Sequence, residues 1–280
     1  MTTMATTDRI ASMNTQMPRT RPISRRRRHR PSLKRRSVTT LAVAAPNAER
    51  RFYMSMIVAM IATVLLGFAR TFFLRPLFPG FPSPPETFFY IHGVLFVGWM
   101  ALLAVQGSLI ATRNVALHMR LGVIAYALVP AMIAFGVIGS LIAARRPGGF
   151  IGIPLPPQQF LSVVLGDMVM FLGFAGLALF WRRRAQTHKR LIMLACIVLM
   201  DPSIGRWPFQ FIAEIPMASF WLKDLFLAAL ALWDIATLKR FHPVTLIGGS
   251  VLIAEGLLRG PIGETQWWLT FAKWAMGLLG

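Results

Sequence analysis

Long apolar runs alternate with short polar segments along most of this chain of 280 residues. There are seven such runs, at 52–74, 88–111, 120–143, 160–181, 190–212, 219–238 and 243–258. A helix of about 20 apolar residues crosses the hydrocarbon core of a bilayer, which is about 30 Å thick. The pattern therefore predicts an all-α fold, a polytopic integral membrane bundle of about seven transmembrane helices.

The composition supports this class and excludes an ordinary soluble domain. Only 14% of the residues are charged and the mean hydropathy is +0.58, whereas a soluble protein carries about 25% charged residues. The single cysteine, Cys196, belongs to no metal-binding motif. No nucleotide loop, serine-nucleophile elbow or zinc-protease motif occurs either. We therefore assign no metal site and no catalytic residue.

The distribution of charge divides the chain into three parts. Thirteen of the 30 Lys and Arg residues lie within residues 1–51, in a stretch rich in Ser, Thr and Pro. We predict a disordered basic arm over 1–50 that contacts the lipid bilayer through anionic headgroups. Nucleic acid is the less favoured partner, because a membrane domain follows directly. Residues 51–260 form the bundle, and the tryptophan-rich segment 261–280 predicts an interfacial helix on the outer face.

Basic residues gather in alternate loops, which predicts the orientation of the bundle. Cytoplasmic loops are enriched in Lys and Arg, so the N-terminus should be cytoplasmic. The loops expected inside are 112–120, 182–190 and 239–242, and those expected outside are 75–87, 144–159 and 203–218. The outside loops are rich in proline, which should make them stiff and non-helical.

The second apolar run carries a stripe of polar residues at a spacing of seven. His92, Trp99, Gln106 and Arg113 fall on one helix face, since seven residues make nearly two turns. In lipid such a stripe must face protein or a water-filled cavity. It predicts either a binding or redox surface, or a seam between two helices.

Ionisable residues also fall at the outer ends of the later runs. Asp167, Asp201, Arg206 and Asp224, together with His92, predict a polar substrate pocket that opens outward. The alternative is that each acid sits at the interface and pairs with its nearest base, Asp201 with Arg206 and Asp224 with its neighbour Lys223.

Three histidines open the helices that follow the inner loops, His118, His188 and His242. Histidine is a haem ligand, and His118 and His188 would meet if the third and fifth runs pack together. Each stands beside Arg or Lys, so the alternative is a solvated boundary residue. His242 precedes Pro243 and is the natural residue of a turn.

Several short motifs occur along the bundle: His92-Gly93, Trp99, Gln106, His118-x-Arg120-Leu121-Gly122, Gly166-Asp167, His188-Lys189-Arg190-Leu191 and Arg206-Trp207-Pro208. Together they resemble a set of uncharacterised bacterial multi-pass membrane proteins over roughly residues 50–260, and no activity comes with that resemblance. A looser similarity is to the haem-bearing bundles of the cytochrome b561 and ferric-reductase kind. Those proteins pair histidines on facing helices, whereas this sequence has one histidine at the outer side and three at the inner boundary.

The sequence leaves three functions open for a protein of the bacterial inner (plasma) membrane. The first is redox or cofactor binding, with haem or quinone held by His92 or by His118 with His188. The second is a transporter or small-molecule binder that uses an outer pocket of Trp99, Gln106, Asp167, Asp201 and Arg206. The third is a non-catalytic assembly partner, as a homo- or hetero-oligomer.

Overall fold

The computed structural model describes residues 46–84, 86–215 and 217–279, all within one unit that covers 40–280. These residues form helices and connecting turns, with no strand among them. The predicted arm lies outside the described residues except for its last five positions. These five positions, 46–50, begin the first helix. Proline is suited to the first turn of a helix, because the N–H that it lacks would have no helical partner there.

Five helical segments of the described chain are long and apolar enough to cross a membrane. They are α1 (Pro46–Phe68) with its continuation Ala69–Phe73, α2 (Thr87–Ala111), Val115–Arg145, α5 (Pro157–Phe180) and α10 (Pro243–Glu264). This confirms the coarse prediction, an all-helical multi-pass membrane protein. The run at 243–258, the shortest in sequence, lies within α10, which is 22 residues long.

The third run, 120–143, is not one regular helix. It takes in the end of α3 (Val115–Leu121), a 3-10 turn at Gly122–Ile124 and most of α4 (Ala125–Arg145). Pro130 lies inside α4 and has no backbone N–H, so the carbonyl of residue 126, one turn before it, loses its usual helical partner.

The fifth run, 190–212, is not one helix. It divides into α6 (Ala185–Val198), α7 (Met200–Ile204) and, beyond a turn, α8 (Gln210–Glu214). Pro202 lies in α7 and cannot donate a hydrogen bond to the carbonyl of Val198, four residues earlier. Val198 is the last residue of α6, so the helix breaks at the position where proline removes a backbone hydrogen bond.

The sixth run forms α9 (Ala218–Leu238), which has the length of a membrane span. It is not among the five apolar helices because Lys223, Asp224 and Asp234 lie within it. Lys223 and Asp234 are both fully buried. The side chains of Lys223 and Asp234 therefore face protein. Each belongs to a buried group of charged residues.

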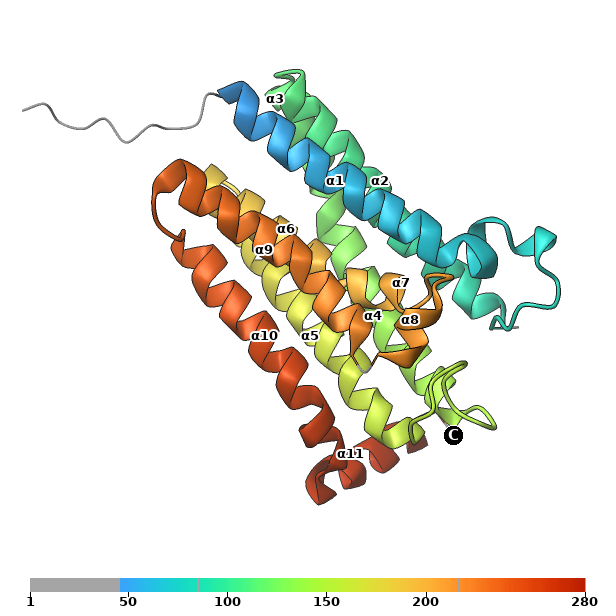
Figure 1. Cartoon of the computed structure of the whole chain (residues 1–280). Coiled ribbons are helices and arrows are strands. Elements are labelled where there is room, and N and C mark those ends of the chain that lie inside the picture. The colour runs from blue at the N-terminus through green and yellow to red at the C-terminus, as the bar shows by residue number, and fades with distance from the viewer. Residues whose placement is uncertain (1–45, 85, 216, 280) are drawn as a thin grey trace, which may run out of the picture. The chain divides into compact units, whose positions relative to one another are not determined.

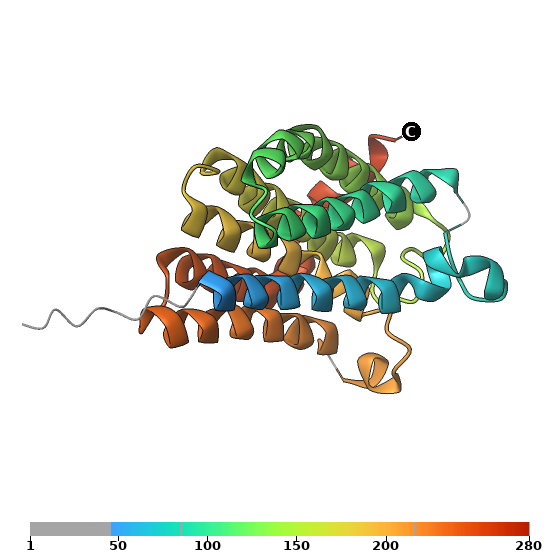
Figure 2. The ribbon, with the colours of Figure 1, turned by 90° about the horizontal axis from the view of Figure 1, so that it is seen from above.

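Helix α5 lies at the centre of the bundle and packs against α4, α6 and α10 (Figure 1). The last helix, α11 (Gln266–Gly277), lies against the ends of α4 and α5. Figure 2 shows α1 between α2 and α9, where the rings of Phe52 and Trp233 stack with their centroids 4.4 Å apart. Large apolar side chains face outward, as the bilayer allows, and Leu232 is 64% exposed.

Glycines permit the closest helix contacts in the interior. A Cβ on Gly67 of α1 would overlap the carbonyl oxygen of Ser203 in α7. This contact fixes the short α7 against α1, so the break after α6 is held in place by backbone packing.

Candidate functional site

Six ionisable side chains meet between α5, α7, α9 and α10. We call them the Asp167 cluster: Asp167, Asp201, Lys223, Asp224, Glu255 and Arg259. Asp167 lies ten residues after the start of α5, which places it about 15 Å along that helix. Arg259 lies five residues before the end of α10, so both residues approach the same end of the bundle.

Arg259 joins three of these helices through its guanidinium group. One nitrogen, Nη2, donates to Oδ2 of Asp201 at 2.5 Å, and Nη1 lies 3.5 Å from Oδ1 of Asp167. The second contact is an ion pair without a hydrogen bond. Asp201 is thus the best-satisfied acid of the cluster, and Asp167 keeps an oxygen without a hydrogen-bond partner among the described residues.

Lys223 is fully buried, and its ammonium has neither a hydrogen bond nor an ion pair within the described chain. Its Nζ atom lies 4.5 Å from the ring centroid of Phe220, and the guanidinium of Arg259 lies 5.4 Å from the same ring. A cation over an aromatic face is attracted by the ring quadrupole. Phe220 rests against Gly256, where a Cβ would overlap the ring. Two cations and one aromatic ring therefore share one buried space.

Glu255 completes the acidic side of the cluster. Both of its carboxyl oxygens are buried without a hydrogen-bond partner in the part of the chain that the structure describes, as is Oδ1 of Asp224. Glu255 lies against Gly166, where a Cβ would come within 2.5 Å of Oε1. Unsatisfied buried polar atoms are uncommon in native proteins and call for an explanation. With four carboxyl groups against two cations, this site can take up protons or a cation.

Sequence reasoning found three members of the cluster and missed Lys223, Glu255 and Arg259 as site residues. Glu255 and Arg259 are four residues apart, so they share one face of α10. An ionisable pair at this spacing, inside or at the edge of an apolar run, was the available signal. The predicted run ended at residue 258 and thus just before Arg259.

The predicted partners of the acids are wrong. Arg206 does not pair with Asp201, because it follows the end of α7 and turns back, with its Nη1 donating to the carbonyl of Pro202 at 2.6 Å. Its guanidinium group packs over the ring of Phe68. Asp224 and Lys223 form no ion pair within the described chain, and the Lys223 ammonium and Oδ1 of Asp224 both lack a hydrogen-bond partner there, because adjacent residues of a helix point about 100° apart.

The other residues of the predicted pocket lie along α2, outside the Asp167 cluster. The Nδ1 atom of His92 hydrogen-bonds with the Phe135 carbonyl of α4 at 3.3 Å. Trp99 is buried edge-on against Phe171 of α5, and Gln106 lies beside Gly122. All three face protein.

The stripe on α2 ends sooner than its spacing predicts. Arg113 does not continue it, because α2 ends at Ala111 and Arg113 takes a left-handed φ of 64° in the following turn. The amide of Gln106 and the indole nitrogen of Trp99 have no hydrogen-bond partner among the described residues. The stripe is thus a helix–helix surface with two unpaired polar groups.

The two inner histidines meet, as their packing would require. The rings of His118 in α3 and His188 in α6 lie 6.5 Å apart, centroid to centroid, at 85°. The Nδ1 atom of His188 donates to the Ala178 carbonyl at 2.8 Å, which leaves Nε2 free to accept a proton or bind a metal. His92 stands near the opposite end of α2 from the turn that leads to His118, so it does not join this pair. His242 caps α10, where its Nδ1 accepts from the backbone of Val244.

A second buried charge network lies beside the start of α10, and we call it the Arg190 network. Arg190 of α6 donates from Nε and Nη2 to Oδ1 of Asp234 in α9, at 3.0 and 2.5 Å. Its Nη1 donates to the side-chain oxygen of Gln186 at 2.7 Å. The backbone N–H of His242 donates to Oδ2 of Asp234 at 3.1 Å. Every charged group of this network has a partner.

A further ion pair lies outside the spans. Arg146, after α4, donates from Nε and Nη2 to the two carboxyl oxygens of Glu86, which precedes α2, at 2.8 Å each. This two-point bond with Arg146 lowers the pKa of the Glu86 carboxyl below its ordinary value. The pair braces the ends of α2 and α4.

Comparisons with protein-family models, with curated proteins and with solved structures give no match for this chain. The chemistry of the site is therefore argued from its own residues.

Proposed function

We propose that this chain is a seven-span protein of the bacterial inner membrane, with a cytoplasmic N-terminus, that transports or binds a small solute. The Asp167 cluster would take up a small cation, or protons that drive the movement of a solute. The observation that carries this proposal is the set of buried ionisable groups without hydrogen-bond partners among the described residues.

The charge balance supports a cationic occupant. Each unpaired carboxylate in a low-dielectric site favours either a proton or a bound cation. Lys223 and Arg259 neutralise two of the four acids at most, and the ammonium of Lys223 touches only a ring face. A site built only for stability would pair these groups, because an unpaired buried charge is costly.

The depth and the broken helix also support a transport site. Charged residues inside membrane spans mark ion and solute pathways by default, and Asp167 lies about halfway through a bilayer core of about 30 Å. Transporters bind solutes near the midplane, where interrupted helices expose backbone carbonyls. The interruption between α6 and α7 lies immediately before Asp201.

The ends of the bundle support the proposed orientation. The proline-rich connections lie at the end where α5 begins, near the cluster, while Arg182, Arg183 and Arg184 follow the other end of α5. Basic loops are cytoplasmic. The cluster would then be reached from the outer side of the membrane.

The test is an electrical recording of transport on proteoliposomes adsorbed to a solid support. The wild type is challenged with pH jumps and with Na⁺, K⁺ or ethylammonium at several fixed pH values. Charge movement should occur and should be lost in Asp167→Asn and in Glu255→Gln. Glu264→Gln is the matched control, because Glu264 is an exposed acid at the end of the same helix as Glu255. Equal signals from all three variants and the wild type would refute the proposal.

A redox function is the second candidate, and one observation favours it. A metal–nitrogen bond is roughly 2 Å long, so two imidazoles on opposite sides of one metal have ring centres about 6 Å apart. The spacing of His118 and His188 is close to that value, and the hydrogen bond that His188 Nδ1 donates to the Ala178 carbonyl orients its ring as metal-binding histidines usually are oriented. Haem bound there would supply one-electron chemistry.

An optical spectrum tests this second candidate. The protein is purified from cells supplied with a haem precursor, and spectra are recorded as isolated and after dithionite. A Soret band that disappears in His118→Ala with His188→Ala supports haem. A featureless spectrum removes haem and leaves the Asp167 cluster as the site.

A further inference from the structure

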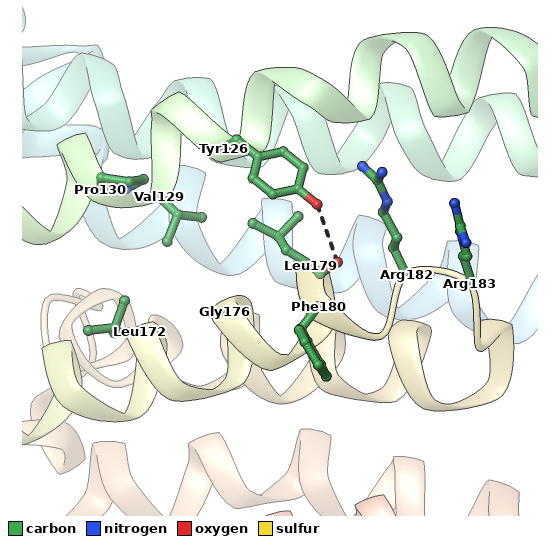
Figure 3. Close-up of a pocket in the computed structure, with 9 residues that line it drawn as sticks. All are labelled: Tyr126, Val129, Pro130, Leu172, Gly176, Leu179, Phe180, Arg182 and Arg183. Carbon is green, nitrogen blue, oxygen red and sulfur yellow. Dashed lines mark hydrogen bonds between the residues drawn. The ribbon is translucent and has the colours of Figure 1, made fainter.

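A groove between α4 and α5 runs along the outside of the bundle, at the end where α5 finishes (Figure 3). Its volume is about 570 Å³, within the range of small-molecule sites. Tyr126, Val129 and Pro130 of α4 line one side, and Leu172 and Gly176 of α5 line the other. The walls are apolar except at one end.

Two arginines stand at that end. Arg182 and Arg183 lie in the turn that follows α5, and in Figure 3 both side chains rise from the turn toward α4. Neither makes an ion pair or a side-chain hydrogen bond within the described chain, and the guanidinium of Arg182 lies 5.5 Å from the centroid of the Tyr126 ring. Phe180, beside them, is 78% exposed. The groove therefore combines a lipid-facing apolar channel with a positively charged mouth.

One hydrogen bond between α4 and α5 and one glycine of α5 shape this groove. The hydroxyl of Tyr126 donates to the Leu179 carbonyl at 3.4 Å and ties α4 to α5 beside the arginines. Gly176 leaves space in the channel, since a Cβ there would meet no atom within 4 Å. Close helix packing does not explain this glycine, which contrasts with Gly136, where a Cβ would overlap Met168.

We propose that this groove binds one anionic phospholipid. Its phosphate would bind Arg182 and Arg183, and an acyl chain would lie along Leu172 and Gly176. The charge selects the occupant, because guanidinium groups bind phosphate by charge-assisted hydrogen bonds. Basic pockets between membrane helices bind anionic headgroups in this way. An apolar segment of a partner protein would gain nothing from the paired arginines.

The test measures binding of single lipids to the full-length protein in detergent by native mass spectrometry. Dioleoyl-phosphatidylglycerol is the probe, and dioleoyl-phosphatidylcholine is its uncharged counterpart. The anionic lipid should bind at least tenfold more tightly. Arg182→Gln and Arg183→Gln should each weaken it about fivefold, as expected for ~1 kcal/mol per basic residue near the surface. Arg184→Gln is the control in the same turn, because Arg184 does not line the groove.

A second pair of variants tests the channel. Gly176→Leu should fill it and lower lipid binding at least tenfold. Gly173→Leu, one turn earlier on α5, also adds a side chain into open space but lies outside the groove, and should bind lipid as the wild type does. Inorganic phosphate is added as a competitor at millimolar concentration.

The outcomes separate the sources of the anion. Loss of binding in Gly176→Leu with weak competition by phosphate supports a whole lipid in the groove. Full displacement by phosphate, equal binding of both lipids, or an effect of Arg184→Gln as large as that of Arg183→Gln would each overturn the proposal.

Discussion

The Arg190 network and the Asp167 cluster are both buried and charged, and they differ in how their charges are satisfied. In the Arg190 network one arginine meets one aspartate in two hydrogen bonds, and a glutamine and a backbone amide bind the remaining groups. In the Asp167 cluster six ionisable groups share one short bond between Arg259 and Asp201. The remaining groups keep atoms without hydrogen-bond partners among the described residues.

The contrast indicates which cluster was built for stability. Burial of an ion pair is tolerable only when further hydrogen bonds satisfy its remaining atoms. The Arg190 network meets that condition and joins α6, α9 and the start of α10. The Asp167 cluster does not, so its unpaired groups have a cost that a bound cation or proton would offset.

The largest expected loss of stability comes from breaking the pair of Arg190 and Asp234. Asp234→Ala leaves the guanidinium of Arg190 buried without its partner, and removing one half of a buried pair costs about 3–5 kcal/mol. The free energy of unfolding, measured by denaturant titration in detergent, should fall by that amount. The double variant Arg190→Met with Asp234→Leu should recover most of the loss, because no charge stays buried. A loss below ~1 kcal/mol in the single variant would show that the network is not structural.

Much of the fold could be predicted from the sequence because lipid acts as a uniform solvent. A segment such as α2 or α5 must be apolar along its whole length, so its composition identifies it without any knowledge of its neighbours. The break before Pro202 is also visible in sequence, since proline removes a defined hydrogen bond. These features depend on one helix at a time.

The candidate site depends on pairs of helices, and there the sequence was insufficient. Arg259 and Asp201 are 58 residues apart, and the packing of both α7 and α10 against α9 brings them together. Nearness in sequence instead favoured Arg206, which bonds to its own turn. Asp167 was found because it stands alone in an apolar run, which is a property of α5 itself. Glu255 was missed although it stands in a similar setting on α10.

The second prediction concerns the short bond within the Asp167 cluster. Asp201→Asn removes the closest charge from Arg259 but leaves Asp167 at 3.5 Å and Glu255 on the same helix. Because other acids replace it, the loss of stability should be about 1–2 kcal/mol, smaller than for Asp234→Ala. The same titration measures it. A loss of 3 kcal/mol or more would mean that both clusters are structural and that the contrast fails.

The third prediction concerns the unpaired ammonium. Lys223→Met removes a charge that forms no ion pair in the described chain and keeps most of the length of the side chain. Replacing poorly satisfied buried charges by apolar residues is often neutral or stabilising. The free energy of unfolding should change by less than ~1 kcal/mol. Arg190→Met makes the same kind of change in the Arg190 network, where every charged group has a partner, and should be strongly destabilising. A large loss of stability in Lys223→Met would show that the contact between Lys223 and Phe220 stabilises the fold.

The smallest expected effect belongs to the ion pair outside the spans. Arg146 lowers the pKa of Glu86 from its ordinary 4.5 in the folded state, so the unfolded chain binds the proton more tightly. The stabilisation is therefore complete above pH 4.5 and is lost as the pH falls through the lowered pKa. An ion pair in contact with water contributes about 1 kcal/mol, and this one is partly exposed, so Glu86→Gln should remove about that part of the acid dependence. Thermal unfolding of both proteins between neutral pH and pH 3 measures the difference.

Unlike the buried clusters, this pair should also weaken in high salt, because charges near water are screened. If the acid dependence of wild type and variant coincided, the brace between α2 and α4 would owe nothing to charge.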